Sequence, residues 1–502
     1  MRDHLVFYVN GVRQAVRGED AAATLSDFLR NRLRLTGTKI VCNEGDCGAC
    51  TVLVGTPNEA AADFRYESID ACIAFVYQMD RKHVVTVEAM AAGGGPSDVQ
   101  QQMIDCHGSQ CGFCTPGFVM AMHGMVEERA EATDCEGPLG DDEMRLGLSG
   151  NLCRCTGYSQ ILEAGAGLSI EGAPRVDAEM DAAAMLADLT ALEPSVHVNA
   201  RSTSVENGFA MNGHAGHAVP ELFLPSTLDA LLARKAERPE AKVVAGATDV
   251  GVQHNHGKIR PTDILTTAGV EELHRLEIVD GALVIGAAVN WSRIERFVAD
   301  RVPEYCAILE RFGSPQVRHA GTLAGNLANA SPIADSIPFH YAAESTIELA
   351  SVDGRRSVAI QDFYLGYKQL EMKPEEIIVS VRTPLPAEGE RLKLYKVSKR
   401  RDMDISTVTA ALLLRLDGDL LTSARVAVGG VGPTVLRLPK AEAELAGRPF
   451  TEETMRAAGC VARGEVTPIS DVRGSADYRW QLVENLFVKC FYDLSTTTPA
   501  TV

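Results

Sequence analysis

The sequence predicts a multidomain α+β protein. At 502 residues the chain is too long for one ordinary hydrophobic core, and this length favours about three domains. A hydrophobic fraction of 46% indicates a globular chain. Segments typical of strands and segments typical of helices follow one another along the chain, separated by glycine- and proline-containing turns. These three observations define the class.

Residues 1–90 are expected to form the first domain. Residues 5–9 and 12–17 have the pattern of a hairpin turned at Asn10 and Gly11, a dipeptide suited to a tight turn. Residues 24–35 have the pattern of a helix, and a β-prone stretch precedes Cys72. This order of elements is the one expected of a ferredoxin-like β-grasp domain.

Eight of the thirteen cysteines fall in two groups: Cys42, Cys47, Cys50 and Cys72, then Cys111, Cys114, Cys153 and Cys155. The first group reads C-x4-C-x2-C with a distant fourth cysteine. That spacing is typical of plant-type [2Fe–2S] sites, because one short loop can wrap three thiolates around a cluster. The second group reads C-x2-C, a long gap, then C-x-C. We predict two [2Fe–2S] centres, and two adjacent redox centres on one chain indicate an electron-transfer path.

Two other uses of these cysteines are possible. Zinc also binds four thiolates, but structural zinc sites usually pair two C-x2-C units, which neither group does. Disulfides would require a secreted protein, yet residues 1–10 contain no apolar signal segment, so we expect a reducing cytoplasm. The remaining cysteines are expected to be isolated thiols: Cys106, Cys135, Cys306, Cys460 and Cys490.

Residues 91–170 predict a helical bundle that carries the second cluster. The segment 93–96 (Gly-Gly-Gly-Pro) is a natural hinge. Apolar residues recur at helical spacing over residues 99–106 and 116–129, with Pro116 suited to start the second helix. Cys111 and Cys114 therefore precede a helix N-terminus, whose dipole favours an anionic cluster. Residues 149–158 form a second turn that leads into a helix.

Charge and hydropathy exclude two classes of partner. The net charge of −19 leaves no basic surplus to replace counterions on phosphates, which argues against a nucleic-acid partner. No apolar run approaches the roughly 20 residues that span a bilayer, so membrane insertion is not expected.

The rest of the chain, from residue 171 on, is expected to contain a linker, a middle domain and a C-terminal domain. Residues 171–217 show no clear strand pattern and are expected to be a linker. Residues 242–251 read as a buried strand that enters a glycine-containing turn, which could present N–H groups to a pyrophosphate or be a plain strand–turn–helix. Residues 430–435 lack the dinucleotide-binding glycine pattern. Strands over 408–414 and 424–428 and a last helix over 475–492, capped by Ser475, are expected in the C-terminal domain.

Three cysteine-containing segments, residues 44–50, 110–117 and 151–158, together resemble the molybdenum hydroxylase family, of which xanthine dehydrogenase is the best-known member. Residues 242–251, 312–326 and 330–335 resemble its flavin-binding domain. The resemblance implies an α+β FAD-binding domain of the PCMH type over 218–395 and an α+β flavoprotein domain over 396–502. It also implies a set of FAD-contacting residues: Val243, Val244, Ala245, Gly246, Ala247, Thr248, Asp249, Val250, Phe312, Thr322, Leu323, Ala324, Gly325, Asn326, Asp335, Ile378 and Lys396.

The family's function follows by the same resemblance. The chain would be an electron-transfer small subunit without catalytic side chains of its own. Its partner would be a separate large molybdopterin-binding subunit that hydroxylates hypoxanthine or xanthine. Electrons would pass from molybdenum to the cluster of Cys111 and its group, then to the cluster of Cys42 and its group, then to FAD and NAD. Two such heterodimers would form a heterotetramer.

Several alternatives stay open at this point. The final electron acceptor could be oxygen instead of NAD, and the oligomeric state is open as well. The partner could instead hydroxylate an aldehyde or another N-heterocycle. The chain could be a free NADH-dependent reductase, although the second cluster domain argues against this. A structural zinc scaffold would require both cysteine groups to be misread. The basic segment 396–405 resembles a family loop near the flavin and could attract a dinucleotide phosphate, or it could be a solvated charge run.

Overall fold

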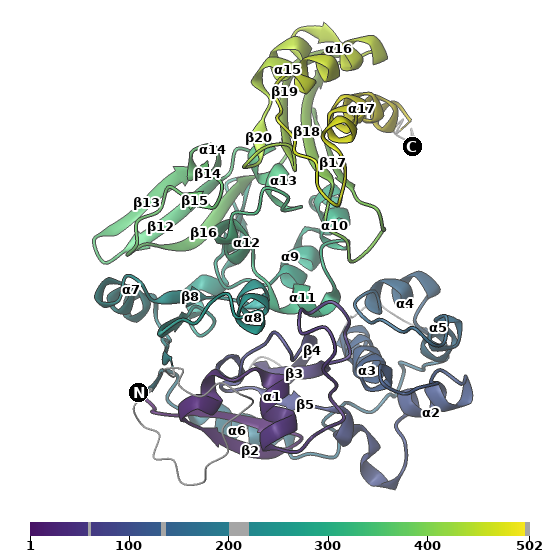
Figure 1. Ribbon diagram of the computed structural model, residues 1–502, viewed down its shortest axis with the longest axis vertical. Coiled ribbons are helices and arrows are strands. Elements are labelled where there is room, and N and C mark those ends of the chain that lie inside the picture. Colours follow the sequence, from purple (N-terminus) through teal and green to yellow (C-terminus); the bar gives the residue numbers. More distant parts are fainter. Residues whose placement is uncertain (59–61, 132–136, 200–219, 497–502) are drawn as a thin grey trace. The chain divides into compact units, whose positions relative to one another are not determined.

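The computed structural model describes residues 1–58, 62–131, 137–199 and 220–496 (Figure 1). The chain divides into two compact units. Unit 1 comprises residues 1–271 together with 313–321, and unit 2 comprises residues 272–312 together with 322–502. The short 3₁₀ turn η6 (Glu271–His274) spans the first boundary between them.

Unit 1 begins with a five-stranded β-grasp sheet of order β2-β1-β5-β3-β4, in which only β1 and β5 pair in parallel. The expected hairpin is confirmed, since Asn10 and Gly11 both have positive φ. The helix expected over residues 24–35 begins as expected, capped by Thr24, but it is shorter: the α-helical turn Leu25–Asp27 passes into a π-helical turn that ends at Arg32. The elements are β1 (Leu5–Val9), β2 (Val12–Val16), η1 (Gly18–Ala22), α1 (Leu25–Asp27), η2 (Phe28–Arg32), β3 (Thr51–Asn58), β4 (Asp63–Asp70), η3 (Val76–Met79), β5 (His83–Val85) and η4 (Val87–Gly94).

Four helices follow: α2 (Asp98–Asp105), α3 (Thr115–Glu131), α4 (Asp141–Gly147) and α5 (Ser159–Ala166). Helices α2, α3 and α5 correspond to the expected ones, whereas sequence reasoning does not locate α4. Helix α2 begins with a capping box, because the Ser97 hydroxyl accepts from the Gln100 amide and the Gln100 side chain accepts from the Ser97 amide. Helix α3 packs on β3 and β4, and one hydrophobic core is shared by the sheet and the helices. The two cysteine-bearing domains are therefore held together by buried apolar contact.

The expectation of a strand-free linker over residues 171–217 is wrong for its described part, and residues 200–217 lie outside the described residues. This part contains helix α6 (Ala182–Ala191) and strand β6 (Val196–Val198). Strand β6 pairs with β7 in a four-stranded sheet of order β6-β7-β9-β8. The remaining elements of unit 1 are β7 (Glu221–Leu224), α7 (Leu228–Glu237), β8 (Lys242–Val244), α8 (Thr248–Asn255), β9 (Asp263–Thr266) and α11 (Pro315–Ala320).

Unit 2 contains a five-stranded antiparallel sheet of order β10-β11-β16-β12-β13, with helices around it. A two-stranded ribbon, β14 with β15, accompanies this sheet. The elements are β10 (Leu276–Val279), β11 (Ala282–Gly286), α9 (Trp291–Val298), α10 (Pro303–Leu309), α12 (Leu323–Asn329), α13 (Ile337–Ala342), β12 (Thr346–Ser351), β13 (Gly354–Ala359), α14 (Ile360–Phe363), β14 (Tyr364–Gly366), β15 (Gln369–Leu370) and β16 (Ile377–Pro384).

The C-terminal part of unit 2 is a second antiparallel sheet, covered by helices that share its core. Both expected strands are present, and the last helix begins as expected, because the Ser475 hydroxyl accepts from the Tyr478 amide. The elements are β17 (Glu390–Val397), β18 (Val408–Asp417), β19 (Leu420–Gly429), β20 (Leu436–Arg437), α15 (Pro439–Leu445), β21 (Arg448–Pro449), α16 (Glu452–Arg463) and α17 (Ala476–Ser495).

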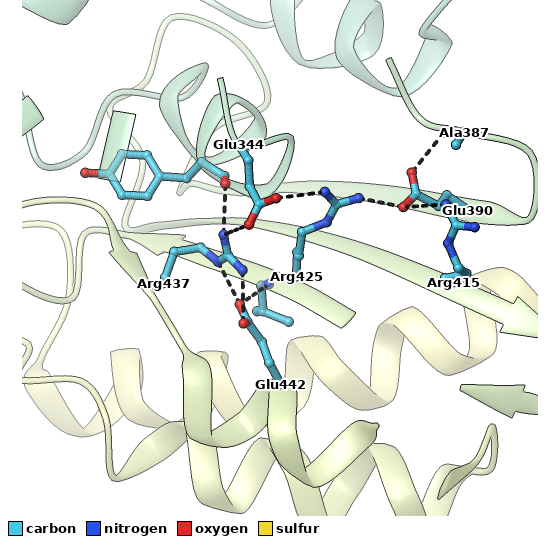
Figure 2. Close-up of polar contacts among 9 residues, drawn as sticks. Glu344, Ala387, Glu390, Arg415, Arg425, Arg437 and Glu442 are labelled. Carbon is cyan, nitrogen blue, oxygen red and sulfur yellow. Dashed lines mark hydrogen bonds and ion pairs between the residues drawn. The ribbon is translucent and has the colours of Figure 1, made fainter. Parts of the chain in front are cut away.

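Two arginines of this second sheet form a charged network around Glu344, which follows α13 (Figure 2). Arg425 lies between Glu344 and Glu390, and Arg437 lies between Glu344 and Glu442. The network therefore ties the end of α13 to strands β17, β19 and β20 and to helix α15.

Candidate iron–sulfur and flavin sites

The first cysteine group is brought together on one side of the β-grasp domain. Cys42, Cys47 and Cys50 lie on the loop before β3, and Cys72 lies just after β4. Hydrogen bonds with the Cys47 and Cys72 thiols lower the pKa of Cys42, and the Cys50 thiol also bonds with Cys72. Cys50 and Cys72 are buried. The four sulfur atoms predicted to bind one cluster therefore face one another.

Backbone N–H groups point at the sulfur of Cys42. The amides of Glu44 and Asp46 both donate to Cys42 Sγ at 3.4 Å. The loop can fold this way because Gly45 and Gly48 adopt positive φ values of 73° and 64°, a backbone region that favours glycine. Such N–H groups stabilise a thiolate and tune the potential of a bound cluster.

The second cysteine group is brought together by two turns of the helical domain. Cys111 and Cys114 lie on the turn before α3, which begins at Thr115, as expected. The Cys111 thiol bonds with Cys155, and the Cys114 thiol bonds with Cys153. Burial and the contact with Cys153 raise the pKa of Cys114 to about 12. Cys111 and Cys155 are exposed, whereas Cys153 is buried.

The loop that follows Cys153 also turns its donors toward sulfur. The Cys155 and Thr156 amides lie 3.4 and 3.5 Å from Cys153 Sγ, and the Thr156 hydroxyl lies 3.2 Å from it. Burial alone would raise the pKa of Cys153, but these hydrogen bonds lower it below its usual value. The Cys153 amide donates to the Tyr158 hydroxyl at 3.0 Å, which closes the loop.

Both donor sets fit [2Fe–2S] clusters, in which four thiolates are shared between two irons. All twelve cysteines that lie in the described residues are free, while Cys135 lies outside the described residues. In the described part of the chain, no group of three or more His, Cys, Asp or Glu side chains is arranged around a single metal ion. A thiolate-only set with N–H donors on its sulfurs suits a cluster, because each iron needs only two of the thiolates.

The residues expected to contact FAD fall in both units. In unit 1, strand β8 runs into the turn at Gly246 and Ala247, and helix α8 begins at Thr248. Ala247 has a positive φ of 62°. A Cβ on Gly246 would overlap the carbonyl oxygen of Ala320. This turn is therefore packed so closely that only glycine fits at residue 246, and Val243 to Val250 keep the strand–turn–helix form that was expected.

In unit 2, Thr322 caps helix α12 by accepting from the Gly325 amide at 3.0 Å. Asn326 Oδ1 on the same helix accepts from the Ser336 hydroxyl at 3.0 Å. The Phe312 ring packs against Trp291, with 4.7 Å between ring centroids. Leu323 and Ala324 are buried in α12, and Ile378 is buried in β16.

Lys396 is not a surface charge, because its side chain is only 2% exposed. Lys396 Nζ donates to the Asp335 carboxylate at 2.6 Å and to the Arg311 carbonyl at 2.8 Å. The Ser406 hydroxyl donates to the other oxygen of Asp335 at 2.5 Å. The structure therefore brings Asp335 and Lys396 together.

The rest of the basic segment behaves differently from Lys396. The Arg400 and Arg401 side chains are 65% and 78% exposed. Arg400 pairs with Asp404 and Arg401 with Asp402, while Lys399 Nζ donates to the carbonyl of Val472. The segment is thus one buried lysine followed by partly paired surface charges.

Sequence reasoning missed Ser406, Trp291 and the carbonyl of Arg311 as neighbours of the proposed flavin residues. No local pattern marks them, because each reaches its partner only through the folded chain. Asn151 and Gln316 were also missed as contacts of the cysteine loops, although both lie within segments that resemble the family.

Comparison with known protein families assigns nearly the whole chain to iron–sulfur and flavin domains, which makes this an iron–sulfur flavoprotein. Residues 7–77 match the 2Fe-2S iron-sulfur cluster binding domain and residues 86–166 the [2Fe-2S] binding domain. Residues 217–386 match the FAD binding domain in molybdopterin dehydrogenase, and residues 393–494 match the CO dehydrogenase flavoprotein C-terminal domain. The chain belongs to the molybdenum hydroxylase family and carries its iron–sulfur and FAD domains.

Curated relatives agree with this assignment. Xanthine dehydrogenase from Blastobotrys adeninivorans is 30% identical over 97% of this chain and 40% of its own length. Aldehyde oxidase 1 from Bos taurus is 30% identical over 98% of this chain and 39% of its own length. The chain thus spans about two fifths of the length of these relatives.

Solved structures with a similar fold include quinoline 2-oxidoreductase from Pseudomonas putida 86, with a TM-score of 0.51 and 28% identity over 54% of this chain and 94% of that one. Carbon monoxide dehydrogenase from Hydrogenophaga pseudoflava gives a TM-score of 0.52 and 27% identity over 54% of this chain and 95% of that one. The expected α+β multidomain fold is therefore confirmed. Within the described residues, no helix is long and apolar enough to cross a membrane.

Proposed function

We propose that this chain is the electron-transfer component of a xanthine dehydrogenase. It would accept electrons from a separate large subunit that carries the molybdenum cofactor and hydroxylates hypoxanthine or xanthine. It would deliver them through two [2Fe–2S] centres and FAD to NAD. The observation that carries the proposal is the pairing of two four-thiol sites within one unit of a chain that also has the family's flavin domains.

The role of this chain's own residues is to hold and tune the cofactors. The eight cysteines would ligate the clusters, and the amides of Glu44, Asp46 and Thr156 would stabilise charge on the ligand sulfurs. Val243 to Val250, Phe312, Thr322 to Asn326, Asp335, Ile378 and Lys396 would hold FAD. When bound, these cofactors supply the redox chemistry, while the protein sets their spacing and potential. No side chain of this chain needs to act as a general base.

The partner and the substrate are supported by the relatives. In solved relatives the matched flavin domains make up a chain of their own, because the chains from quinoline 2-oxidoreductase and carbon monoxide dehydrogenase are covered to 94% and 95%. We therefore assign the molybdenum cofactor to a partner, in a heterodimer that pairs into a heterotetramer. The xanthine substrate is favoured by xanthine dehydrogenases that match nearly the whole chain. A second candidate, the equivalent component of an aldehyde or other N-heterocycle hydroxylase, is favoured by the similarity to aldehyde oxidase 1 and quinoline 2-oxidoreductase.

Co-purification of the chain from its native host tests the proposal. We expect roughly four irons and one FAD per chain, a large molybdopterin-bearing partner, and NAD reduction by xanthine. Activity on an aldehyde or quinoline but not on xanthine would support the second candidate. Iron and FAD with no molybdenum-bearing partner would instead indicate a free NADH-dependent reductase.

A further inference from the structure

A buried amide bridge connects the two cysteine loops of unit 1. Gln316 Nε2 donates to Asn151 Oδ1 at 2.9 Å and to the Thr51 hydroxyl at 3.2 Å. Asn151 Nδ2 donates to the Gly48 carbonyl at 3.0 Å. Asn151, Gln316 and Thr51 are 3%, 1% and 1% exposed. Each bond is therefore shielded from water, where its loss is costly because the abandoned partner is left unsatisfied.

Each member of the bridge is a near neighbour of a cluster ligand. Gly48 follows Cys47, Thr51 follows Cys50, and Asn151 lies two residues before Cys153. Beside the bridge, the Leu152 amide donates directly to the Cys47 carbonyl at 3.0 Å. One hydrogen bond and the backbone of Leu152 therefore join a ligand of the first site to Cys153, a ligand of the second.

The two loops are packed against each other at contact distance. A Cβ on Gly48 would lie 2.5 Å from both Asn151 Nδ2 and the Gly150 carbonyl. A Cβ on Gly117, at the start of α3, would overlap the Gly48 carbonyl, and one on Gly150 would overlap Gln316 Oε1. The three glycines thus allow close backbone packing between the loops, and the hydrogen bonds of the amide bridge determine their relative position.

The third member of the bridge comes from a different domain. Gln316 lies on α11, inside the segment that matches the flavin-binding family, and is 165 residues from Asn151 in sequence. The same helix places His319 between the two domains, where its Nδ1 bonds to the Ser68 carbonyl at 2.7 Å and its Nε2 to Glu128 at 2.7 Å. Helix α11 therefore forms hydrogen bonds to both cysteine-bearing domains.

We propose that Gln316 and Asn151 are positioning residues for electron transfer between the two iron–sulfur centres. Their bridge holds the Cys47 loop against the Cys153 loop and keeps the Cys47 carbonyl and the Leu152 amide bonded. Electronic coupling falls steeply when a through-space gap replaces bonded atoms, so this contact sets the transfer rate. The inference rests on the proposed function, since it requires both clusters.

The test uses the full chain loaded with clusters and FAD, and compares Gln316→Leu and Gln316→Glu with the unaltered protein. Leucine removes both donated bonds, while glutamate keeps the shape but places an acceptor against Asn151 Oδ1. The matched control is Gln101→Leu, which removes one amide bond to Asp105 on the exposed face of α2. Two readouts are used: the mutual splitting of EPR lines when both clusters are reduced, and the rate of electron re-equilibration between them after pulse reduction.

We expect both Gln316 variants to retain iron, FAD and the g-values of each cluster, with weaker splitting and transfer slowed by at least about tenfold, because small misplacements of reacting groups are costly. The control should match the unaltered protein. Unchanged splitting and rate in both variants would overturn the inference. Loss of a cluster in both would also overturn it, because Gln316 would then serve assembly. Failure of the proposed function shows separately, as missing iron or FAD in the unaltered chain.

Discussion

Lys396 and Asp335 form an ion pair that is almost completely removed from solvent, with 2.6 Å between Nζ and Oδ2. Their side chains are 2% and 9% exposed. A buried charge is tolerated when its partner and additional hydrogen bonds compensate for lost hydration, which the Arg311 carbonyl and the Ser406 hydroxyl do here. The pair joins strand β17 to the loop before α13.

Asp335→Asn should destabilise unit 2 strongly, because it leaves the Lys396 ammonium buried without a counter-charge. We expect the free energy of unfolding to fall by about 3–5 kcal/mol, measured by urea denaturation with and without FAD. The matched control is Arg448→Gln, which breaks an ion pair with Glu444 whose arginine is 57% exposed and should cost less than about 1 kcal/mol. Equal losses in the two variants would contradict the buried-pair argument.

Replacing one cysteine in each group should remove one cluster at a time. Cys47→Ser and Cys153→Ser are each expected to lower the iron content from roughly four to roughly two per chain, because each [2Fe–2S] cluster needs four thiolates. FAD content should be retained. Cys460→Ser, at an exposed cysteine of α16, should leave iron unchanged. Iron loss from both sites in each single variant would show that the two groups do not assemble separate clusters.

Gly246→Val should reduce FAD binding, because any Cβ at this turn overlaps the Ala320 carbonyl and must displace the strand–turn–helix. We expect purified protein with less than stoichiometric FAD and a weaker flavin absorbance, while the iron content stays unchanged. Gly140→Ala is the control, since a Cβ there meets no atom within 4 Å. Full FAD occupancy in Gly246→Val would contradict the assignment of this turn to the flavin site.

The features that sequence predicts well in this chain are those with local causes. The hairpin at Asn10 and Gly11 follows from the positive φ values that those two residues accept readily. The start of α17 follows from the hydroxyl of Ser475. Most cluster ligands follow from cysteine spacing, because one loop carries Cys42, Cys47 and Cys50 and two short turns carry the pairs of the second group.

The features that sequence does not predict depend on partners distant in the chain. The three-residue strand β6 owes its place to β7 and to a bridge between Val196 and Arg2, none of which its own residues encode. The burial of Lys396 depends on Asp335, 61 residues away. The bridge from Gln316 to Asn151 spans 165 residues. At such positions the residue type alone does not indicate burial or a specific hydrogen bond, because the partner comes close only in the folded chain.

The network in Figure 2 should contribute unevenly to stability. Arg437 makes two bonds to Glu442, at 2.7 and 3.0 Å, and both side chains are mostly buried. Arg437→Leu should therefore lower the free energy of unfolding by about 2 kcal/mol, measured by thermal and urea denaturation. Glu344→Gln alters the half-exposed end of the same network and should cost less than about 1 kcal/mol. A larger decrease in the free energy of unfolding for Glu344→Gln than for Arg437→Leu would mean that Glu344 contributes most to the stability of the network.

Acid should destabilise unit 2 through His340. This side chain is fully buried between Tyr305 and Thr383, with hydrogen bonds of 3.0 and 2.9 Å, and burial lowers its pKa to about 3. In the unfolded chain a histidine titrates near pH 6.5, so below that pH the unfolded state binds a proton that the folded state does not bind. The stability contributed by neutral His340 is therefore complete above about pH 6.5. As the pH falls from there toward 3, the free energy of unfolding decreases by about 1.4 kcal/mol per pH unit.

We expect His340→Gln to be less stable at neutral pH, because glutamine cannot reproduce both hydrogen bonds, but to lose stability less steeply as the pH falls. Burial also lowers the pKa of His83 and of His123 to about 4, so part of the acid sensitivity should remain. Thermal melts between about pH 7 and pH 4.5 measure the slope. Gln481→Leu provides the control, since it removes one exposed hydrogen bond to Asn485 on α17 and no titratable group, and it should leave the slope unchanged. If His340→Gln and the unaltered chain lose stability with the same slope, the neutral buried histidine is not a source of acid sensitivity.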